Sequence, residues 1–269
     1  MMLEIKQEDF VRLSRFIIDN YGINLTNKKN LIEGRLGKTI TDMGFSGFTE
    51  YVDHLLRTKN PHDLETLLNK VTTNHTYFMR ERSHFDFFES VILPEIEKNC
   101  RNHSPGIWCA ASSSGEEPYT MSIILREYFG KKTPRWDTRM LASDISKKVL
   151  ATATKGTYTA ESLKDMPEVW KNKYFTKTGV DYTVTKELRD NVIFKEFNLM
   201  DPIKFKTKFD CIFCRNVMIY FDQQTKDALV RRFFDVMNPG GFLLIGHSET
   251  LNKVNSPFEY LMPATYRKP

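Results

Sequence analysis

From residue 106 onward, short apolar runs alternate with segments of helical character, and each run ends in small or polar residues. The runs occupy residues 107–111, 140–144, 192–198, 209–214 and 241–246, and helix-like segments at 118–129, 147–154 and 222–237 lie between several of them. Strands that are apolar on both faces are typical of parallel sheets, in which a helix crosses back over the sheet between strands. The pattern therefore predicts an α/β domain built on a doubly wound parallel sheet.

Residues 156–190 break this alternation. Tyr174-Phe175 and residues 182–184 are short runs of β-prone residues, and Thr178-Gly179 between them is typical of a turn. We expect a small antiparallel β subdomain at about 156–190, inserted between the second and third strands of the sheet.

The first ninety residues have apolar residues at helical rather than alternating spacing. Two such series are Phe48, Tyr51, Val52, Leu55 and Leu56, and Leu64, Leu67, Leu68 and Val71. Asn60-Pro61 places a capping residue before a proline at the first helical position. We expect an all-α N-terminal domain at 1–90, followed by the sheet domain at 91–269.

Cysteine content and apolar run length exclude several classes. Four scattered cysteines do not make a disulfide framework, and Cys211 and Cys214 lie three apart in one expected strand, where they point to opposite faces. We therefore expect no metal site. No apolar run reaches the roughly 18 to 20 residues of a membrane helix, and the first nine residues are too acidic and polar for a secretory signal. A cytoplasmic protein without membrane insertion is expected.

The formal charge is +5 and unevenly distributed. Residues 1–101 hold 14 Lys and Arg against 15 Asp and Glu, so the positive excess lies in the later part of the chain. No run of five or six like charges and no basic-aromatic repeat appears, which favours a solvated surface over a nucleic-acid interface.

Polar residues follow the expected strands at the points where ligands of open parallel sheets bind. Small residues at 110–115 allow close approach of a ligand, but no G-x-G-x-x-G is present, and Glu116-Glu117 would repel a pyrophosphate while suiting a cationic ligand. Asp144 is placed either to accept hydrogen bonds from ribose hydroxyls or to cap the following helix, and both readings stay open here.

Five motifs together resemble the chemotaxis receptor methyltransferases (CheR family). They are residues 73–80 (TNHTYFMR), 110–119 with its Ser-Gly-Glu-Glu-Pro-Tyr core, 142–145, Asn198-Leu199 and 214–221 (CRNVMIYF). The order of helical domain, sheet domain and inserted subdomain is also similar to that family. The resemblance implies a Rossmann-like methyltransferase sheet and S-adenosylmethionine-dependent methylation of glutamate side chains on the cytoplasmic helices of chemoreceptors, for adaptation in chemotaxis. The products would be glutamate methyl esters and S-adenosylhomocysteine.

The resemblance also implies the roles of individual residues. Arg80 and Tyr220 would face the transferred methyl group. Glu117 would bind the amino or sulfonium-bearing end of the cofactor, Asp144 the ribose, and Asn198-Leu199 the adenine edge. The full cofactor-binding set is Asn74, Thr76, Arg80, Glu117, Asp144, Asn198, Leu199, Arg215 and Asn216. No metal and a monomeric protein are expected.

The sequence leaves several alternatives open. Arg80 would otherwise form a surface salt bridge with Glu81 or Asp86, and residues 247–249 would either line the substrate entrance or form a polar turn. Lys28, Arg35 and Lys38 would steer the protein toward acidic receptor helices or simply be solvated.

Two rival functions remain: a noncatalytic module that binds the cofactor, and a methyltransferase that acts on RNA or a small acid. The β subdomain resembles the part that docks a receptor C-terminal peptide in some family members, and those members share a longer, glycine-rich loop there. Because the turn at 177–180 is short and has one glycine, we expect no such docking in this chain.

Overall fold

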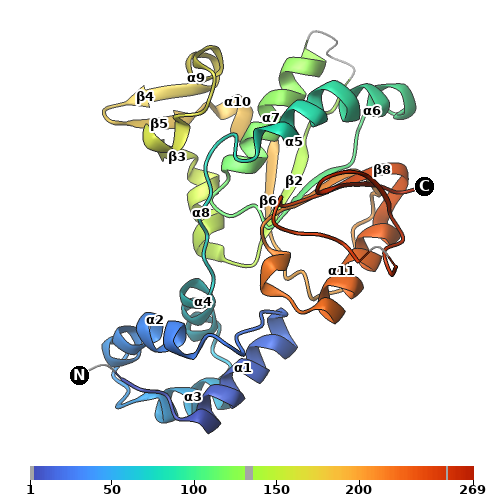
Figure 1. Cartoon of the computed structure of the whole chain (residues 1–269). Coiled ribbons are helices and arrows are strands. Elements are labelled where there is room, and N and C mark those ends of the chain that lie inside the picture. The colour runs from blue at the N-terminus through green and yellow to red at the C-terminus, as the bar shows by residue number, and fades with distance from the viewer. Residues whose placement is uncertain (1–2, 131–135, 253) are drawn as a thin grey trace. The chain divides into compact units, whose positions relative to one another are not determined.

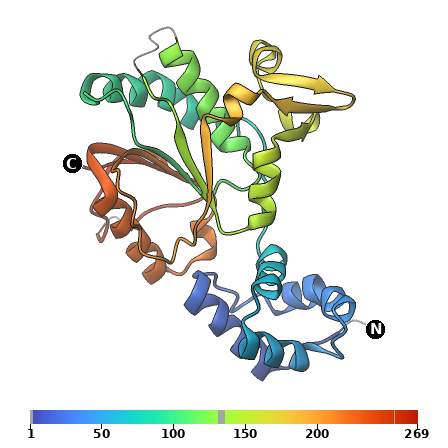
Figure 2. The same cartoon turned by 180° about the vertical axis from the view of Figure 1, so that it is seen from behind.

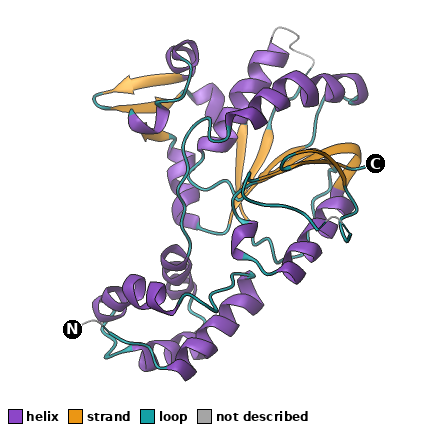
Figure 3. Cartoon of the chain, in the orientation of Figure 1, coloured by secondary structure: helices purple, strands orange, loops and turns teal. Residues whose placement is uncertain are grey.

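The computed structural model describes residues 3–130, 136–252 and 254–269, and its chain forms two compact units. The first unit comprises residues 1–74 and 220–225, and the second comprises residues 75–219 and 226–269. Within the described residues the first unit contains helices and no strand (Figure 3). Segment 220–225 therefore belongs to the helical unit although it follows a strand of the sheet in the sequence.

Four helices make up most of the first unit: α1 (Gln7–Tyr21), α2 (Lys29–Asp42), α3 (Phe48–Thr58) and α4 (Pro61–Val71). Their apolar stripes meet in a core that includes Leu13, Ile17, Tyr51 and Leu55, all fully buried. Asn60 caps α4 as expected, because its side chain accepts hydrogen bonds from the backbone N–H groups of His62 and Asp63.

The second unit is built on a seven-stranded sheet with the order β6-β2-β1-β7-β8-β10-β9. Its strands are β1 (Ile107–Ala110), β2 (Met140–Asp144), β6 (Val192–Glu196), β7 (Phe209–Cys214), β8 (Met237–Ile245), β9 (Glu259–Met262) and β10 (Thr265–Arg267). The first five are parallel to one another, and β10 pairs antiparallel with β8 and β9.

Strand alternation gives the sheet two buried faces. One face carries Cys109, Cys211 and Phe213 into a core shared with α7 (Glu116–Phe129) and with the helical stretch formed by α5 (Arg82–Phe87), the π-helical turn η1 (Phe88–Ile92) and α6 (Leu93–Asn99). The other face carries Trp108, whose indole packs edge-on against Phe233 of α11 (Gln223–Val236). Cys211 and Cys214 are free thiols in β7, and their separation of three residues directs them to opposite faces.

A small antiparallel sheet of order β3-β5-β4 projects beside α8 (Lys147–Lys155), as Figure 1 and the reverse view in Figure 2 show. It consists of β3 (Thr157–Thr159), β4 (Phe175–Thr178) and β5 (Asp181–Val184), with the 3-10 turn η3 (Glu161–Leu163), α9 (Glu168–Tyr174) and α10 (Lys186–Arg189). The hydroxyl of Tyr158 in β3 donates to the carbonyl of Ser114 at 2.7 Å, which ties this subdomain to the loop after β1.

The expected fold class is confirmed: a doubly wound sheet with an antiparallel insertion follows an all-α region. The strand pair β9 and β10 was not expected. The compact units divide after Asn74 rather than near residue 90, because Phe85 stacks on Phe213 and Phe88 packs edge-on against the same ring. The helices after residue 81 therefore belong to the core of the sheet.

Gly106 offers a test of the packing at the start of the sheet. A Cβ at this position would lie 2.2 Å from the carbonyl oxygen of Lys208. Gly34 lies at an exposed position in the middle of α2, where an added Cβ would meet nothing within 4 Å. We expect Gly106→Ala to lower the free energy of unfolding by about 1 to 3 kcal/mol through overpacking. Gly34→Ala should raise it by up to about 1 kcal/mol through helix propensity. Urea denaturation of both variants measures the two effects, and equal shifts would contradict the packing described here.

Candidate active site

The carboxyl ends of the parallel strands lie along one edge of the large sheet. The chain passes from β1 through β2 to β6 on one side, and then places β7 and β8 on the other side of β1, so the topological switch lies between β1 and β7. Ligands of open α/β sheets bind outside such a switch. Glu117 follows β1, and Arg215 and Asn216 follow β7, so three of the predicted residues flank this point.

The buried guanidinium of Arg215 connects two carboxylates. Its Nη1 donates to Oε2 of Glu117 at 2.8 Å, and its Nη2 and Nε donate to Oε2 of Glu81 at 3.0 and 3.3 Å. Nη2 also donates to the carbonyl oxygen of Arg80. A buried charge is tolerated when it is paired and hydrogen-bonded, and most donors of Arg215 are engaged by the chain itself.

Glu117 lies in the first turn of α7, where the helix dipole stabilises a negative charge. Its Oε1 accepts a hydrogen bond from the thiol of Cys109 at 3.2 Å. Burial, together with the charge of Glu117, raises the pKa of Cys109, so the thiol stays protonated and can donate this hydrogen bond. Each carboxylate oxygen has two lone pairs, and the structure shows one donor on each oxygen of Glu117.

Glu249 shapes the loop that follows β7. Its Oε2 accepts from the backbone N–H groups of Asn216 at 3.0 Å and Gly246 at 2.6 Å, and its Oε1 accepts from that of Ile219 at 3.0 Å. Burial raises the pKa of Glu249, and these hydrogen bonds oppose the rise. Residues 247 and 248 form a turn, and Glu249 directly after it organises the neighbouring loop, while the role of this segment at a substrate entrance stays a prediction.

Asp144 orders the loop after β1 from the end of β2. Its Oδ2 accepts from the N–H of Ser113 at 2.9 Å, and its Oδ1 accepts from that of Ser146 at 3.0 Å. Burial raises its pKa, and the backbone hydrogen bonds lower it again in part. The N-cap of α8 is Ser146, whose hydroxyl oxygen accepts from Val149 N–H, so the helix-cap reading of Asp144 is wrong.

Asn198 and Leu199 follow β6 next to the end of β2. The N–H of Phe197 donates to the carbonyl of Asp144 at 3.0 Å, which holds this segment beside the strand tip. Oδ1 of Asn198 accepts from Met200 N–H at 3.0 Å, and Leu199 is buried. These two residues and Asp144 are thus neighbours at one part of the sheet edge.

Arg80 lies on a strained piece of backbone. Met79 and Glu81, on either side of it, have φ values of 64° and 56°, in the left-handed region that non-glycine residues rarely adopt. Nη1 of Arg80 donates to the carbonyl of His75 at 2.7 Å, and half-buried Thr76 lies in the same segment. The expected alternative, a salt bridge with Asp86, is formed by Arg82 instead, at 3.6 Å.

Tyr220 belongs to the helical unit. Its carbonyl accepts from Asn24 N–H at 2.7 Å, its hydroxyl donates to the carbonyl of Thr73 at 3.4 Å, and Nζ of Lys28 lies 5.1 Å from the centroid of its ring. Exposed Asn74 is the last residue of the first chain segment of this unit. Two of the predicted residues, Asn74 and Tyr220, are therefore placed by the helical unit, and the other predicted residues by the sheet unit.

Arg35 supports the same part of the helical unit. It donates to the carbonyls of Lys70 at 3.2 Å and Thr72 at 3.1 Å, and to the hydroxyl of Thr73 at 3.1 Å. Arg35 thus satisfies carbonyl groups at the end of α4. Arg35 and Lys28 make contacts within the helical unit, and the steering or solvated role of Lys28, Arg35 and Lys38 stays a prediction.

Comparison with known proteins decides the family. The all-alpha domain of the CheR methyltransferases matches residues 8–72, and the SAM-binding domain of the CheR methyltransferases matches residues 74–267. The chain belongs to the CheR methyltransferase family. This confirms the resemblance and identifies a domain that binds S-adenosylmethionine.

Three relatives span nearly the same length as this CheR-family chain. The chemotaxis protein methyltransferase of Borreliella burgdorferi is 43% identical, covering 99% of this chain and 96% of the relative. A probable chemotaxis protein methyltransferase of Rhizobium etli is 34% identical, covering 93% of this chain and 96% of the relative. The chemotaxis protein methyltransferase of Escherichia coli is 34% identical, covering 95% of this chain and 89% of the relative. In the described residues, no helix combines the length and apolar character needed to cross a membrane.

Two residues of this CheR-family chain, Glu81 and His84, join the candidate site without having been expected there. Glu81 contacts Arg215, and the Nδ1 atom of its neighbour His84 lies 3.7 Å from Oε2 of Glu81. His84 is fully buried and its ring packs edge-on against that of His247. The available signal was the position of Glu81 directly after Arg80, the last residue of one of the family motifs.

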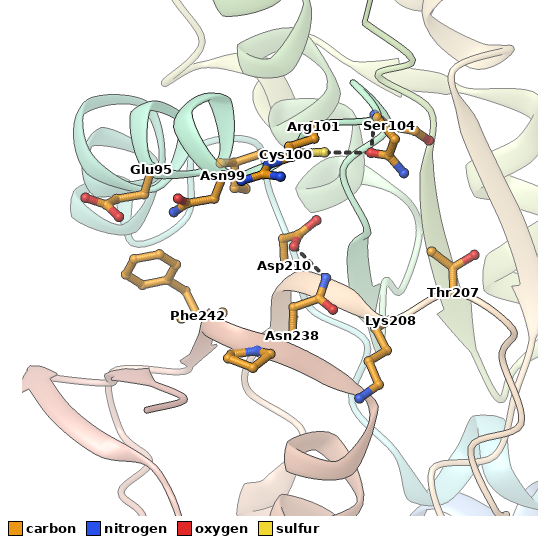
Figure 4. Close-up of a pocket in the computed structure, with 15 residues that line it drawn as sticks. Glu95, Asn99, Cys100, Arg101, Ser104, Thr207, Lys208, Asp210, Asn238 and Phe242 are labelled. Carbon is orange, nitrogen blue, oxygen red and sulfur yellow. Dashed lines mark hydrogen bonds between the residues drawn. The ribbon is translucent and has the colours of Figure 1, made fainter.

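A pocket of ≈ 590 Å³ lies at the opposite end of the sheet (Figure 4). Residues at the beginnings of β7 and β8 contribute to its lining. Among them, Nδ2 of Asn238 donates to Oδ1 of Asp210 at 2.7 Å. None of the predicted site residues lines it. The candidate active site is therefore defined by the strand tips rather than by this pocket.

The buried His84 predicts a specific dependence of stability on pH. Burial, followed by the charge of Arg215, lowers its pKa to about 4. Below about pH 6.5 the histidine is therefore protonated in the unfolded chain while it stays neutral in the folded protein. The free energy of unfolding is accordingly highest above pH 6.5 and decreases as pH falls toward 4. Between pH 6.5 and 5 this loss amounts to about 2 kcal/mol. Urea denaturation of His84→Leu should show a correspondingly shallower decline.

His62→Leu removes an exposed histidine of α4 and serves as the control for deleting a histidine. If His84→Leu and wild type lose stability in parallel between pH 6.5 and 5, the low pKa of His84 is refuted.

Proposed function

We propose that this CheR-family protein transfers the methyl group of S-adenosylmethionine to glutamate side chains of chemoreceptor cytoplasmic helices. The products are glutamate 5-O-methyl esters and S-adenosylhomocysteine, and the reaction serves adaptation in chemotaxis. The protein acts in the cytoplasm as a monomer, without a nucleic-acid substrate or a metal. The observation that carries this proposal is the Glu117 carboxylate at the topological switch, with lone pairs available for a cationic group.

The residues at the strand tips fit the chemistry of this cofactor. Glu117 would accept hydrogen bonds from its ammonium group, and Asp144 those from its ribose hydroxyls. Asn198 and Leu199 would contact the adenine, and Asn216 would contact the amino-acid end. Asn74 and Thr76 complete the proposed binding set. In this proposal Arg215 acts by holding Glu117, because most of its own donors are already engaged.

The transfer itself needs positioning more than acid–base catalysis. S-adenosylmethionine supplies an electrophilic methyl group on a sulfonium. A glutamate side chain, with an ordinary pKa of about 4.3, is already ionised at neutral pH and needs no base. Alignment of the reacting atoms at about 3 to 3.5 Å can lower the barrier by about 7 to 11 kcal/mol. Arg80 would orient the entering carboxylate by charge-assisted hydrogen bonds, and the Tyr220 hydroxyl would orient the carboxylate or the methyl group.

Incubation of the full chain with methyl-labelled cofactor and receptor cytoplasmic fragments tests this function. We expect base-labile label on receptor glutamates. Label on added RNA instead, or cofactor binding without any transfer, would refute the proposal in favour of the rival functions.

Variants of the two proposed catalytic residues sharpen the test. Tyr220→Phe should lower kcat by about 10-fold to 100-fold, because small errors in orientation are costly. The matched control is Tyr260→Phe, which removes the hydroxyl of an exposed tyrosine in β9 and should leave kcat unchanged.

Arg80→Ala should lower kcat/KM for the receptor fragment by about 10-fold to 100-fold. This decrease corresponds to the free energy of one lost hydrogen bond to a charged group. Wild-type rates in Tyr220→Phe and Arg80→Ala would contradict these roles.

We propose that the β subdomain does not bind the C-terminal peptide by which some chemoreceptors tether the enzyme. Thr178 pairs with Asp181, so the turn between β4 and β5 consists of Gly179 and Val180 alone. Family members that bind the tether resemble one another in having a longer, glycine-rich loop at this place. Calorimetric titration with a receptor C-terminal peptide should show no binding in the micromolar range, and a micromolar dissociation constant would overturn this expectation.

A further inference from the structure

We propose that Glu81 is a positioning residue for cofactor binding: its carboxylate orients Arg215, which in turn orients Glu117 toward the cationic end of the cofactor. This inference rests on the proposed role of Glu117, and it assigns a function to a residue that no family motif quoted above includes.

Glu81 accepts hydrogen bonds from two separate segments of the sheet unit, those that follow β7 and β8. Its Oε2 accepts from Nη2 and Nε of Arg215 after β7 and from the backbone N–H of His247 after β8, the last at 3.2 Å. Its Oε1 accepts from Nδ2 of Asn216 at 3.1 Å. A single side chain thus connects the end of β7, the end of β8 and the start of α5.

The backbone at Glu81 supports a dedicated role. Glu81 stands at the N-cap position of α5 with a left-handed φ of 56°, yet its side chain makes no hydrogen bond that caps the helix. A left-handed glutamate costs roughly 1 to 2 kcal/mol, which glycine would avoid. The carboxylate reaches across to Arg215 instead, with 14% of its side-chain surface exposed.

The charges explain how Glu81 influences Glu117. Arg215 lies between the two carboxylates, so its positive charge is shared by both. Without the charge on Glu81, the guanidinium would pair with Glu117 alone. Glu117 would then be less available to an ammonium group, and Arg215 would lose the contact that fixes its orientation. Both effects weaken the binding of a cationic ligand.

A metal site is the competing interpretation of this cluster. Ligand atoms of Glu81, His84 and His247 lie within 4.8 Å of one another. However, both oxygens of Glu81 already accept hydrogen bonds, and the guanidinium of Arg215 occupies the position beside Oε2. A dication would have to displace that cation, so we assign the carboxylate to positioning.

Two ligands separate positioning from general structural support. S-adenosylhomocysteine carries the amino-acid end that Glu117 would bind, whereas 5′-methylthioadenosine keeps the nucleoside and lacks that end. Calorimetry on the full chain should show that Glu81→Gln weakens S-adenosylhomocysteine about 10-fold and changes 5′-methylthioadenosine by less than about 2-fold. The control Glu89→Gln, at an exposed position in η1, should change neither affinity. Equal weakening of both ligands, or of neither, would overturn the assignment.

A double-mutant cycle tests the path through Glu117. If Glu81 acts by way of Glu117, Glu81→Gln should add less than about 2-fold to the loss of S-adenosylhomocysteine affinity already caused by Glu117→Gln. Additive losses would refute that path. Should Glu81→Gln fail to fold, Glu81→Asp keeps the charge at a shorter reach and must still weaken S-adenosylhomocysteine selectively.

These measurements use binding alone. They can fail while receptor methylation succeeds, and they can succeed even if the methyl acceptor proves to be something other than a glutamate.

Discussion

The sheet unit depends on one buried cation that has to be paired. Arg215 is enclosed directly after β7, and the chain surrounds it with the carboxylates of Glu81 and Glu117, the carbonyl of Arg80 and the ring face of Phe85. Removing any one partner would leave part of a buried charge uncompensated, which is costly in a protein interior. The ends of β1 and β7 and the start of α5 are thus held in a fixed arrangement by the same interaction.

Carboxylates serve elsewhere in this unit as fixed acceptors for loop backbone. Asp144 receives the N–H groups of Ser113 and Ser146, and Glu249 receives those of Asn216, Gly246 and Ile219. At the opposite end of the sheet, Asp210 accepts from Gly106 N–H at 2.8 Å. A carboxylate with several N–H donors orders a turn that would otherwise carry unsatisfied groups. The loops at the candidate site are consequently shaped by negative charge, which suits a cationic cofactor.

The sequence predicted those features that depend on local pattern. Apolar runs and helical periodicity placed the parallel strands and α7, α8 and α11, and the motifs pointed to residues at the strand tips. The strand β9 was missed because it is short and mostly exposed, so it lacks an alternating pattern. Glu81 was missed because its partners lie 134 to 166 positions away in the chain. The place of Tyr220 within the helical unit likewise depends on Asn24, far away in sequence.

At Met79 and Glu81, which both have a left-handed φ, the residue that best suits the backbone differs from the residue that best suits the side-chain contacts. Glycine or asparagine would relax the backbone at both positions, so selection for thermal stability alone would favour such exchanges. At position 79 the exchange would remove a buried apolar side chain, but at position 81 it would delete the carboxylate that holds Arg215. The most strained backbone of this segment is therefore also where a gain in robustness would be hardest to reconcile with activity.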